Sequence, residues 1–208
     1  MTQTPSDTTP GFRFWHGAQR WTGTPELRPS RPQSYHCGPG LYLTTHVDTA
    51  RKYAKGGGQM VLVEVAPEAT VLEDSWLPLA DLLQGLASLP RVKGRKAIEQ
   101  DLRQSAQRFP DGQMPAEFLM NLCVNQDALG GETGPALARW YASKGIDVSL
   151  YSRSRGEDWV VVFNPTKIRQ ARVCRGNEPW EIGDFPMWRA QHAAVSPPEP
   201  PPRRPRPR

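Results

Sequence analysis

Two histidines and a cysteine lie close together in the sequence at His36, Cys37 and His46, and these residue types bind metals or act as nucleophiles. A protein metal site usually draws on a second closely spaced pair of ligands, and none accompanies these three residues. A Cys37–His thiol hydrolase is conceivable, but any chain with a cysteine and a histidine permits that combination. We therefore expect no metal, and neither pattern predicts a function by itself.

Glycine-rich segments offer another kind of chemistry, the binding of phosphate by backbone amides. The chain contains no GxxxxGK(S/T) motif, which excludes a P-loop. Residues 55–59, KGGGQ, precede a predicted strand instead of opening a helix, so no helix dipole would face a phosphate there. A tight turn accounts for these glycines.

The more informative residues are His16-Gly17, at the end of one predicted strand, and Tyr42, inside another. Taken singly, a strand histidine or tyrosine usually packs in the core or at its rim with its polar tip hydrogen-bonded. The acidic pair Glu157-Asp158 lies in RSRGED, a sequence typical of a solvated turn. Their combined order along the chain favours a functional role.

The elements that must position these residues follow from hydrophobic periodicity. Strands are predicted at residues 12–17, 41–45, 59–66, 147–151, 159–164 and 167–173. A helix over residues 46–55, with Thr45 as its cap, is predicted between the second and third strands.

Apolar residues recur at helical spacing through residues 76–144, with breaks near Pro90, Pro110 and Gly130-Gly131. This order of elements fits neither a doubly wound nor an all-β architecture. It predicts an α+β fold with a split, mostly antiparallel β-sheet and a helical insertion at about 76–144.

The chain of 208 residues fits one domain with appendages. We expect residues 1–11 to be disordered, residues 12–186 to form the domain, and residues 187–208 to be a disordered Pro/Arg-rich tail. Four arginines and one glutamate in residues 197–208 contribute +3 of the net charge of +5, so the remainder of the chain is nearly balanced. Such a tail could contact RNA, an acidic partner or a proline-binding module, and improved solubility is the simpler account.

Three features bear on location. No apolar run reaches about 18 residues, so no membrane association is expected. The polar N-terminus lacks the pattern of a signal peptide. The three cysteines, Cys37, Cys123 and Cys174, are widely scattered, as is typical of free thiols in a reducing compartment. A cytoplasmic protein is expected.

Four segments in order, FWHG, GPGLYLTTHVDTARKYA, QMVLVEV and WVVVFNPTKI, resemble the catalytic core of ADP-ribosyltransferases of the diphtheria-toxin and poly(ADP-ribose) polymerase branch. The resemblance covers about residues 12–66 and 145–170. In that family a strand ends in His-Gly, a second strand carries Gly-x-Gly-aliphatic-Tyr, and the next helix carries another tyrosine. Tyr53 occupies this last position here.

The resemblance implies a role for each of these residues toward NAD⁺ as substrate. The backbone of Gly17 would pair with the nicotinamide carboxamide, and His16 would hydrogen-bond a ribose hydroxyl. Tyr42 and Tyr53 would stack on the nicotinamide ring. In the long loop between the first two strands, three arginines would meet the pyrophosphate: Arg20, Arg28 and Arg31.

The family also places a glutamate at the start of the strand WVVVFN, and here the sequence departs from the pattern. The expected position falls on Trp159, just after Glu157 and Asp158. We expect Asp158 to be the catalytic acid, which requires a β-bulge in the strand. Without a bulge, Glu157 lies on the same face as Trp159 and becomes the candidate. The third alternative is that no acid serves, which would leave a weak or inactive enzyme.

The implied function is mono-ADP-ribosyl transfer from NAD⁺ to a protein or nucleic-acid acceptor. Small enzymes of this kind are often bacterial or phage toxins, so a cognate inhibitor or antitoxin is an expected partner. The alternatives are NAD⁺ hydrolysis, with water as acceptor, and a non-catalytic module that binds NAD⁺ or ADP-ribose.

Overall fold

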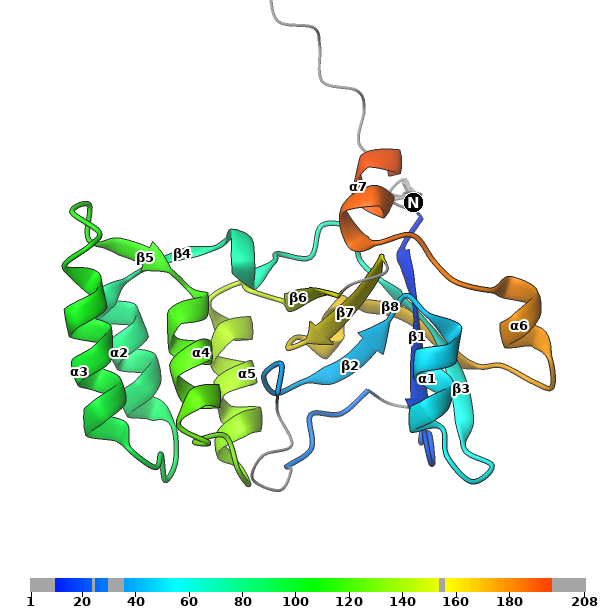
Figure 1. Ribbon diagram of the computed structural model, residues 1–208, viewed down its shortest axis with the longest axis horizontal. Helices are drawn as coiled ribbons and strands as arrows, with labels where there is room; N and C mark the ends of the chain where they lie inside the picture. Colours follow the sequence, from blue (N-terminus) through cyan, green and yellow to red (C-terminus); the bar gives the residue numbers. More distant parts are fainter. Residues whose placement is uncertain (1–9, 24, 30–35, 154–155, 196–208) are drawn as a thin grey trace, which may run out of the picture.

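The computed structural model describes residues 10–23, 25–29, 36–153 and 156–195. Its main sheet has six strands in the order β6-β7-β2-β1-β3-β8, all paired antiparallel with their neighbours (Figure 1). The strands are β1 (Phe12–Ala18), β2 (Leu41–Thr44), β3 (Gln59–Val65), β6 (Val148–Arg153), β7 (Glu157–Val162) and β8 (Ile168–Val173). The prediction of an α+β fold with a mostly antiparallel sheet is confirmed.

The sheet opens between its two central strands. β1 pairs with β3 over seven residues, but it meets β2 at the single register pair Trp15↔Thr44. β2 pairs along its other edge with β7 over four residues. The two halves of the sheet therefore diverge beyond Trp15, and His16-Gly17 and Tyr42 lie on either side of the opening.

The helical segment between β3 and β6 forms its own layer beside β6 and β7, at the left of Figure 1. It contains α2 (Leu79–Ser88), α3 (Arg95–Ala106), α4 (Glu117–Asn125) and α5 (Thr133–Ser143), with breaks where the prolines and glycines predicted them. Its buried interior is mainly leucine and isoleucine: Leu82, Leu86, Ile98, Leu102, Leu119 and Leu137. A short hairpin of β4 (Trp76–Pro78) and β5 (Gln113–Pro115) inside this segment was not predicted.

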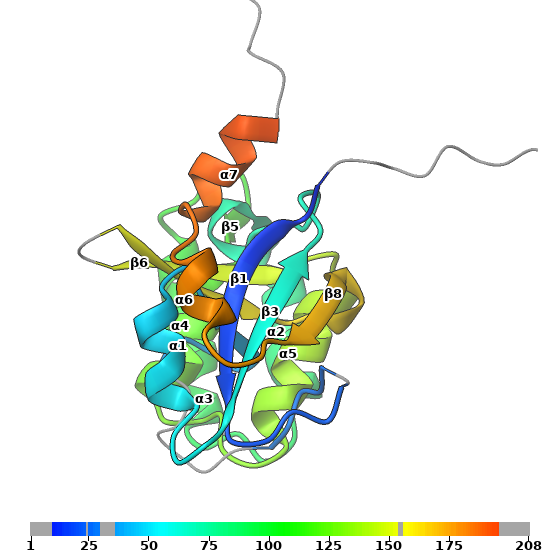
Figure 2. The same ribbon diagram turned by 90° about the vertical axis from the view of Figure 1, so that its right-hand side faces the viewer.

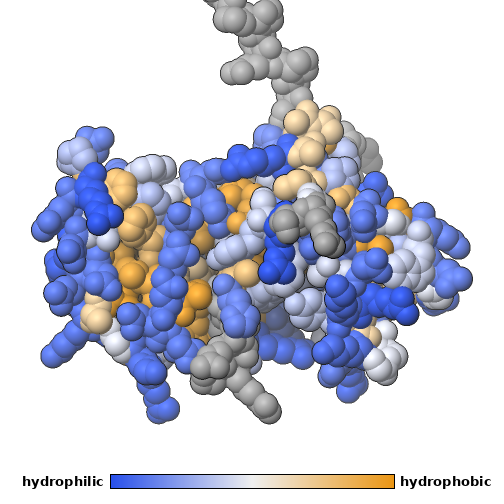
Figure 3. Space-filling model, viewed as in Figure 1, coloured by the Kyte–Doolittle hydropathy of each residue, from blue (hydrophilic) through white to orange (hydrophobic). Residues whose placement is uncertain are grey.

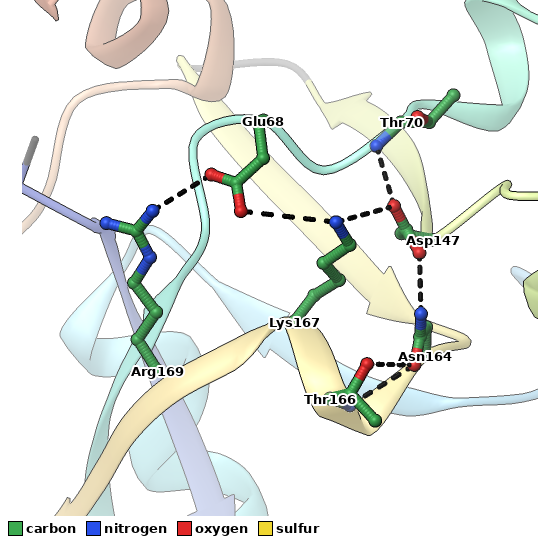
Figure 4. Close-up of polar contacts among 7 residues, drawn as sticks. All are labelled: Glu68, Thr70, Asp147, Asn164, Thr166, Lys167 and Arg169. Carbon is green, nitrogen blue, oxygen red and sulfur yellow. Dashed lines mark hydrogen bonds and ion pairs between the residues drawn. The ribbon is translucent and has the colours of Figure 1, made fainter. Parts of the chain in front are cut away.

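Two contacts fix this layer to the sheet. The Tyr141 ring of α5 stacks on Phe163 at 5.5 Å, and its hydroxyl donates to the Ala116 carbonyl at 2.8 Å. At the base of the insertion the buried Asp147 carboxylate accepts from the Thr70 amide at 3.0 Å and from Asn164 Nδ2 at 2.7 Å (Figure 4). Because Thr70 and Asp147 flank the insertion, these bonds close it at its base.

Lys167, in the short 3₁₀ helix η2 (Pro165–Lys167), partly balances this buried carboxylate, with its Nζ 3.7 Å from Asp147 Oδ2. The same Nζ lies 4.0 Å from Glu68, which also pairs with Arg169 at 3.0 Å (Figure 4). A second 3₁₀ helix, η1 (Leu72–Asp74), leads into the insertion.

Helix α1 (Val47–Tyr53) follows β2 and packs against β1. The predicted cap at Thr45 is wrong: Thr45 Oγ1 accepts from the Asp158 amide at 3.0 Å, and the helix begins one residue later. The carboxylate of Asp184 instead accepts from the Val47 amide at 2.8 Å, and an anion is favourable at this end of a helix.

The C-terminal part of the described chain forms α6 (Glu178–Ile182) and α7 (Trp188–Val195), and α7 lies over the beginning of β1 (Figure 2). Trp188 is 3% exposed and packs edge-on to Phe12 at 4.9 Å and stacked on Phe14 at 5.8 Å. The expected end of the domain at residue 186 is therefore wrong, because the fold includes residues up to 195. The expected disorder of residues 1–9 and 196–208 concerns residues outside the described part of the chain.

No helix among the described residues is both long and apolar enough to cross a membrane.

Candidate functional site

A cavity of about 600 Å³ lies where β1 and β2 diverge under α1. It brings together four of the residues singled out in the sequence: His16, Gly17, Tyr42 and Tyr53. Its other lining residues are Trp15, His36, Cys37, Leu43, Thr44, Thr49, Ala50, Arg153 and Trp159. The opening in the sheet therefore brings together residues of the first two motifs, FWHG and GPGLYLTTHVDTARKYA, with Trp159 of the fourth.

His16 bridges the opening. Its Nδ1 lies 2.8 Å from the Tyr42 carbonyl oxygen, which can only accept, so Nδ1 carries the hydrogen and donates. Burial lowers the pKa of His16, and the bond to Tyr42 opposes this only in part. The imidazole is therefore neutral near pH 7, and Nε2 is left as a hydrogen-bond acceptor.

Three aromatic rings form one wall of the cavity. Trp159 lies edge-on to Tyr42 at 6.4 Å and edge-on to Tyr53 at 6.1 Å. The Tyr42 hydroxyl donates to the Gly38 carbonyl at 2.6 Å and accepts from the Cys37 amide at 3.3 Å, so this ring is held in place. Tyr53, at the end of α1, is 55% exposed and stands at the mouth.

Gly17 has a structural reason to be glycine. A Cβ at this position would lie 1.8 Å from the Ala50 carbonyl oxygen, because α1 crosses directly over β1 there. Any larger residue would push α1 away and disturb the cavity. The role that the resemblance implies for the Gly17 backbone stays a prediction.

The resemblance implies a catalytic acid, and the register of β7 determines which of the two acidic residues lies on the face of Trp159. β7 pairs without a shift to both neighbours, with Thr44↔Trp159 on one side and Arg153↔Glu157 on the other. The expected bulge is therefore wrong, and Glu157 lies on the same face as Trp159. Asp158 points to the opposite face.

Asp158 is 2% exposed and is built into the fold. One carboxylate oxygen accepts from Ser152 Oγ at 2.7 Å, and the other accepts from the Trp188 amide at the start of α7, also at 2.7 Å. Because both of its oxygens are engaged in these bonds, Asp158 anchors α7. Neither Asp158 nor Glu157 is itself among the lining residues of the cavity. The first choice of catalytic acid therefore loses the geometric basis on which it depended.

Glu157 is attached to the cavity wall. Its Oε1 accepts from Thr44 Oγ1 at 2.8 Å and from Trp159 Nε1 at 2.7 Å. Burial opposes the charge of this carboxyl group, but hydrogen bonds from Thr44, Trp159 and Thr49 outweigh it and lower the pKa of Glu157. The structure thus holds an ionised carboxylate beside three lining residues.

Two of the three predicted arginines lie at a second cavity of about 570 Å³, which shares His16, Gly17 and Tyr42 with the first. Arg20 and Arg28 line it, and Arg28 also pairs with Glu26 at 3.3 Å. Arg31 lies outside the described residues. The two cavities thus meet at the residues expected to hold the nicotinamide and its ribose.

Two lining residues that could interact with a ligand, an aromatic one and a cationic one, were not predicted from the sequence. Trp159 was considered only as the place where an acid was expected, and its aromatic role follows from the period-2 alternation of β7. Arg153 lies over the Trp159 ring, with its guanidinium carbon 4.3 Å from the centroid. Its position opposite Glu157 depends on the β6–β7 register, which local sequence does not reveal.

The structure gives little support to a thiol hydrolase at Cys37. Burial raises the pKa of this thiol, with the charge of Arg153 opposing, so the reactive thiolate is disfavoured near pH 7. Among the described residues, no group of three histidine, cysteine or acidic side chains is arranged to hold a metal ion.

Comparison with protein-family models, with curated proteins and with solved structures finds no match to this chain.

Proposed function

We propose that the protein is a mono-ADP-ribosyltransferase that cleaves NAD⁺ at the bond between nicotinamide and ribose. The observation that carries the proposal is the single cavity that joins His16, Gly17, Tyr42 and Tyr53. These residues come from two strands and a helix, so residues that are far apart in the sequence meet at one cavity. Glu157, bonded to the lining residues Thr44 and Trp159, supplies an anion next to this cavity.

The nicotinamide ring would enter between Tyr42 and Tyr53. A planar cationic ring gains from stacking on aromatic faces, by about 0.5–1.5 kcal/mol for each contact. Trp159 would close the inner side, because it lies edge-on to both tyrosines. The fixed Tyr42 ring would define the plane in which the nicotinamide ring lies. The exposed Tyr53 ring would cover the ligand after entry.

His16 would orient the ribose. Its neutral ring, with Nδ1 donating to Tyr42, offers Nε2 to accept from a ribose hydroxyl. The rest of the dinucleotide would continue into the second cavity, where Arg20 and Arg28 could approach the pyrophosphate.

In the reaction, the bond from ribose C1′ to the nicotinamide nitrogen breaks, and its electron pair leaves with neutral nicotinamide. The ribose then carries oxocarbenium-like positive charge, which an ionised Glu157 would stabilise in a cavity of low effective dielectric. A lone pair of the acceptor forms the new bond to C1′, and the acceptor loses one proton to solvent. Because the pKa of Glu157 is lowered, its role is electrostatic stabilisation more than proton removal.

The test is nicotinamide release by Glu157→Gln and by Asp158→Asn, two isosteric changes at neighbouring positions. We expect Glu157→Gln to lower kcat by about 10²–10³-fold with NAD⁺ binding retained, as for loss of one preorganised electrostatic partner. Asp158→Asn should keep kcat within about threefold of the wild type, because an amide can still accept from the Trp188 amide and donate to Ser152. The reverse pattern, or no NAD⁺ binding by the wild type at millimolar concentration, would overturn the proposal.

A non-catalytic NAD⁺-binding module is the second candidate. It is favoured by one observation, that the position expected for the acid carries Trp159, whose ring lies in the cavity wall. Binding of NAD⁺ without nicotinamide release would identify this case. If nicotinamide is released, radiolabelled NAD⁺ separates transfer to a macromolecule from hydrolysis by water.

A further inference from the structure

The outer surface of α1 carries a group of exposed cations beside the cavity mouth. We define the α1 surface as Arg51, Lys52, Tyr53 and Lys55, together with Arg153 on β6; all five are exposed. Tyr53 and Arg153 also line the cavity. The surface is thus continuous with the place where ADP-ribose would be transferred, and Figure 3 shows hydrophilic side chains over this helix.

The cations of the α1 surface are not neutralised by the fold. Arg51, Lys52 and Lys55 line a shallow depression of about 530 Å³ with a single carboxylate, that of Asp48. Among the described residues, no carboxylate oxygen lies within 4.0 Å of any of these three cations or of Arg153. Cations that lie near one another without carboxylate partners attract an anionic ligand.

Aromatic rings are interleaved with these cations. Arg153 lies over Trp159, and Arg51 lies over the 41% exposed ring of Trp180 at 5.2 Å. Tyr53, between Lys52 and Lys55 in sequence, exposes a further ring. Of these rings, those of Tyr53 and Trp180 are exposed. Exposed rings among cations without carboxylate partners are the features that proteins use to bind single strands, because phosphates meet the charges and bases stack on the rings.

We propose that the α1 surface binds a single-stranded nucleic acid and delivers it to the cavity as the acceptor of ADP-ribose. The inference about transfer rests on the proposed function, while the inference about binding does not. A nucleophilic nitrogen or oxygen of the strand attacks ribose C1′, neutral nicotinamide leaves with the electron pair of the broken bond, and the attacking group releases a proton to solvent. An acidic peptide would meet the same charges, but it gives the exposed rings nothing to stack on.

Binding is tested by fluorescence anisotropy on the full chain with labelled oligothymidylate and oligouridylate of about 15 nucleotides. The variant Lys52→Gln/Lys55→Gln removes two charges from the α1 surface. Its matched control, Lys93→Gln/Lys96→Gln, removes two exposed charges near the start of α3, where no exposed large ring accompanies them. Any contribution of the arginine-rich tail is the same in both variants.

We expect the α1 variant to bind about tenfold more weakly than the wild type. Its slope of log affinity against log salt should fall by about 1.4, since each phosphate contact to a single strand contributes about 0.7. The control should stay within about twofold in affinity. Equal losses in both variants, or displacement of the oligonucleotide by polyglutamate at equal charge concentration, would overturn the proposal.

Transfer is tested with radiolabelled NAD⁺ and the same oligonucleotides. We expect label on the oligonucleotide from the wild type, at least about tenfold less from Lys52→Gln/Lys55→Gln, and unchanged nicotinamide release by that variant without oligonucleotide. Nicotinamide release with no labelled oligonucleotide would refute the acceptor and leave the proposed function standing. No nicotinamide release at all, with oligonucleotide binding as expected, would refute the proposed function and the transfer step and leave the binding surface.

Discussion

At the scale of single residues, the chemistry of the cavity depends on side chains whose charge is set by their neighbours. Glu157 stays ionised because three hydrogen bonds to its carboxylate outweigh burial, and His16 stays neutral because burial outweighs its one bond. Both shifts favour the protonation states that cleavage of the nicotinamide bond would use near pH 7.

The His16 shift predicts a pH dependence. Its folded-state pKa lies below the usual value of about 6.5, so at lower pH the unfolded chain takes up the proton first. Stability from this residue is therefore present above pH 6.5 and is lost as the pH falls towards the folded pKa. The acid limb of kcat/KM for NAD⁺ should likewise have its midpoint below about 6.5, because protonated Nε2 no longer accepts from ribose.

We compare urea unfolding of the wild type and of His16→Asn between pH 8 and pH 5. The comparison separates the effect of His16 on the pH dependence of stability from that of the other histidines. The decline in stability should be smaller in the variant. An acid limb of kcat/KM centred above pH 7 would contradict a neutral His16.

Tyr53 provides a direct test of ring stacking, because its exposure separates binding from folding. We expect Tyr53→Ala to weaken NAD⁺ binding about 3–10-fold, as loss of one stacking contact of about 0.5–1.5 kcal/mol implies. Its Tm should change little, since the ring is 55% exposed. Calorimetric titration and a thermal melt of the same preparation measure both quantities. An unchanged Kd would remove Tyr53 from the site.

Tyr42 is less suited to this test. Its hydroxyl is bonded to Gly38 and Cys37, and its ring packs against the helical layer. Truncation of Tyr42 would therefore alter folding and binding together.

At the scale of elements, α7 and β7 are linked through one carboxylate. Asp158 is covered by the first turn of α7, and Trp188 of that turn fills the space over Phe12 and Phe14. Because Asp158 and Glu157 are neighbours on β7, the docking of α7 and the position of the proposed catalytic carboxylate are set by the same strand.

We predict that Asp158→Ala lowers the free energy of unfolding by about 1–3 kcal/mol, because it leaves the Trp188 amide without its buried partner. Trp188→Ala should cost about 3–5 kcal/mol by opening a cavity. The double variant should lose less than the sum of the two, since either change releases α7. Urea unfolding of the three variants measures this, and strict additivity would show that Asp158 does not act through α7.

At the scale of the whole molecule, the described fold ends with α7, and the Arg-Pro segment follows it. A chain that stops after Val195 keeps every described contact, whereas one that stops after Pro186 loses Trp188 and its packing. We predict that the first truncation retains nicotinamide release at the wild-type rate and Tm. The second should lower Tm by several degrees, as loss of a buried tryptophan implies.

Melting curves and nicotinamide assays on both truncated chains provide the measurement. Loss of nicotinamide release on truncation after Val195 would mean that the Arg-Pro segment takes part in the chemistry. An unchanged Tm on truncation after Pro186 would contradict the packing of α7.

Local sequence by itself predicted the six strands of the main sheet, α1 and the helical character of residues 76–144, but not the β4–β5 hairpin or α7. These ranges followed from hydrophobic periodicity, and for a strand without a bulge the period-2 alternation placed Glu157 with Trp159 and Asp158 opposite them. Only the tertiary structure decided that β7 has no bulge, that Asp158 bonds to an amide 30 residues away, and that α1 crosses Gly17 closely enough to require glycine. The reason is physical: periodicity reflects the neighbours of a residue along the chain, whereas these contacts join segments that only packing brings together.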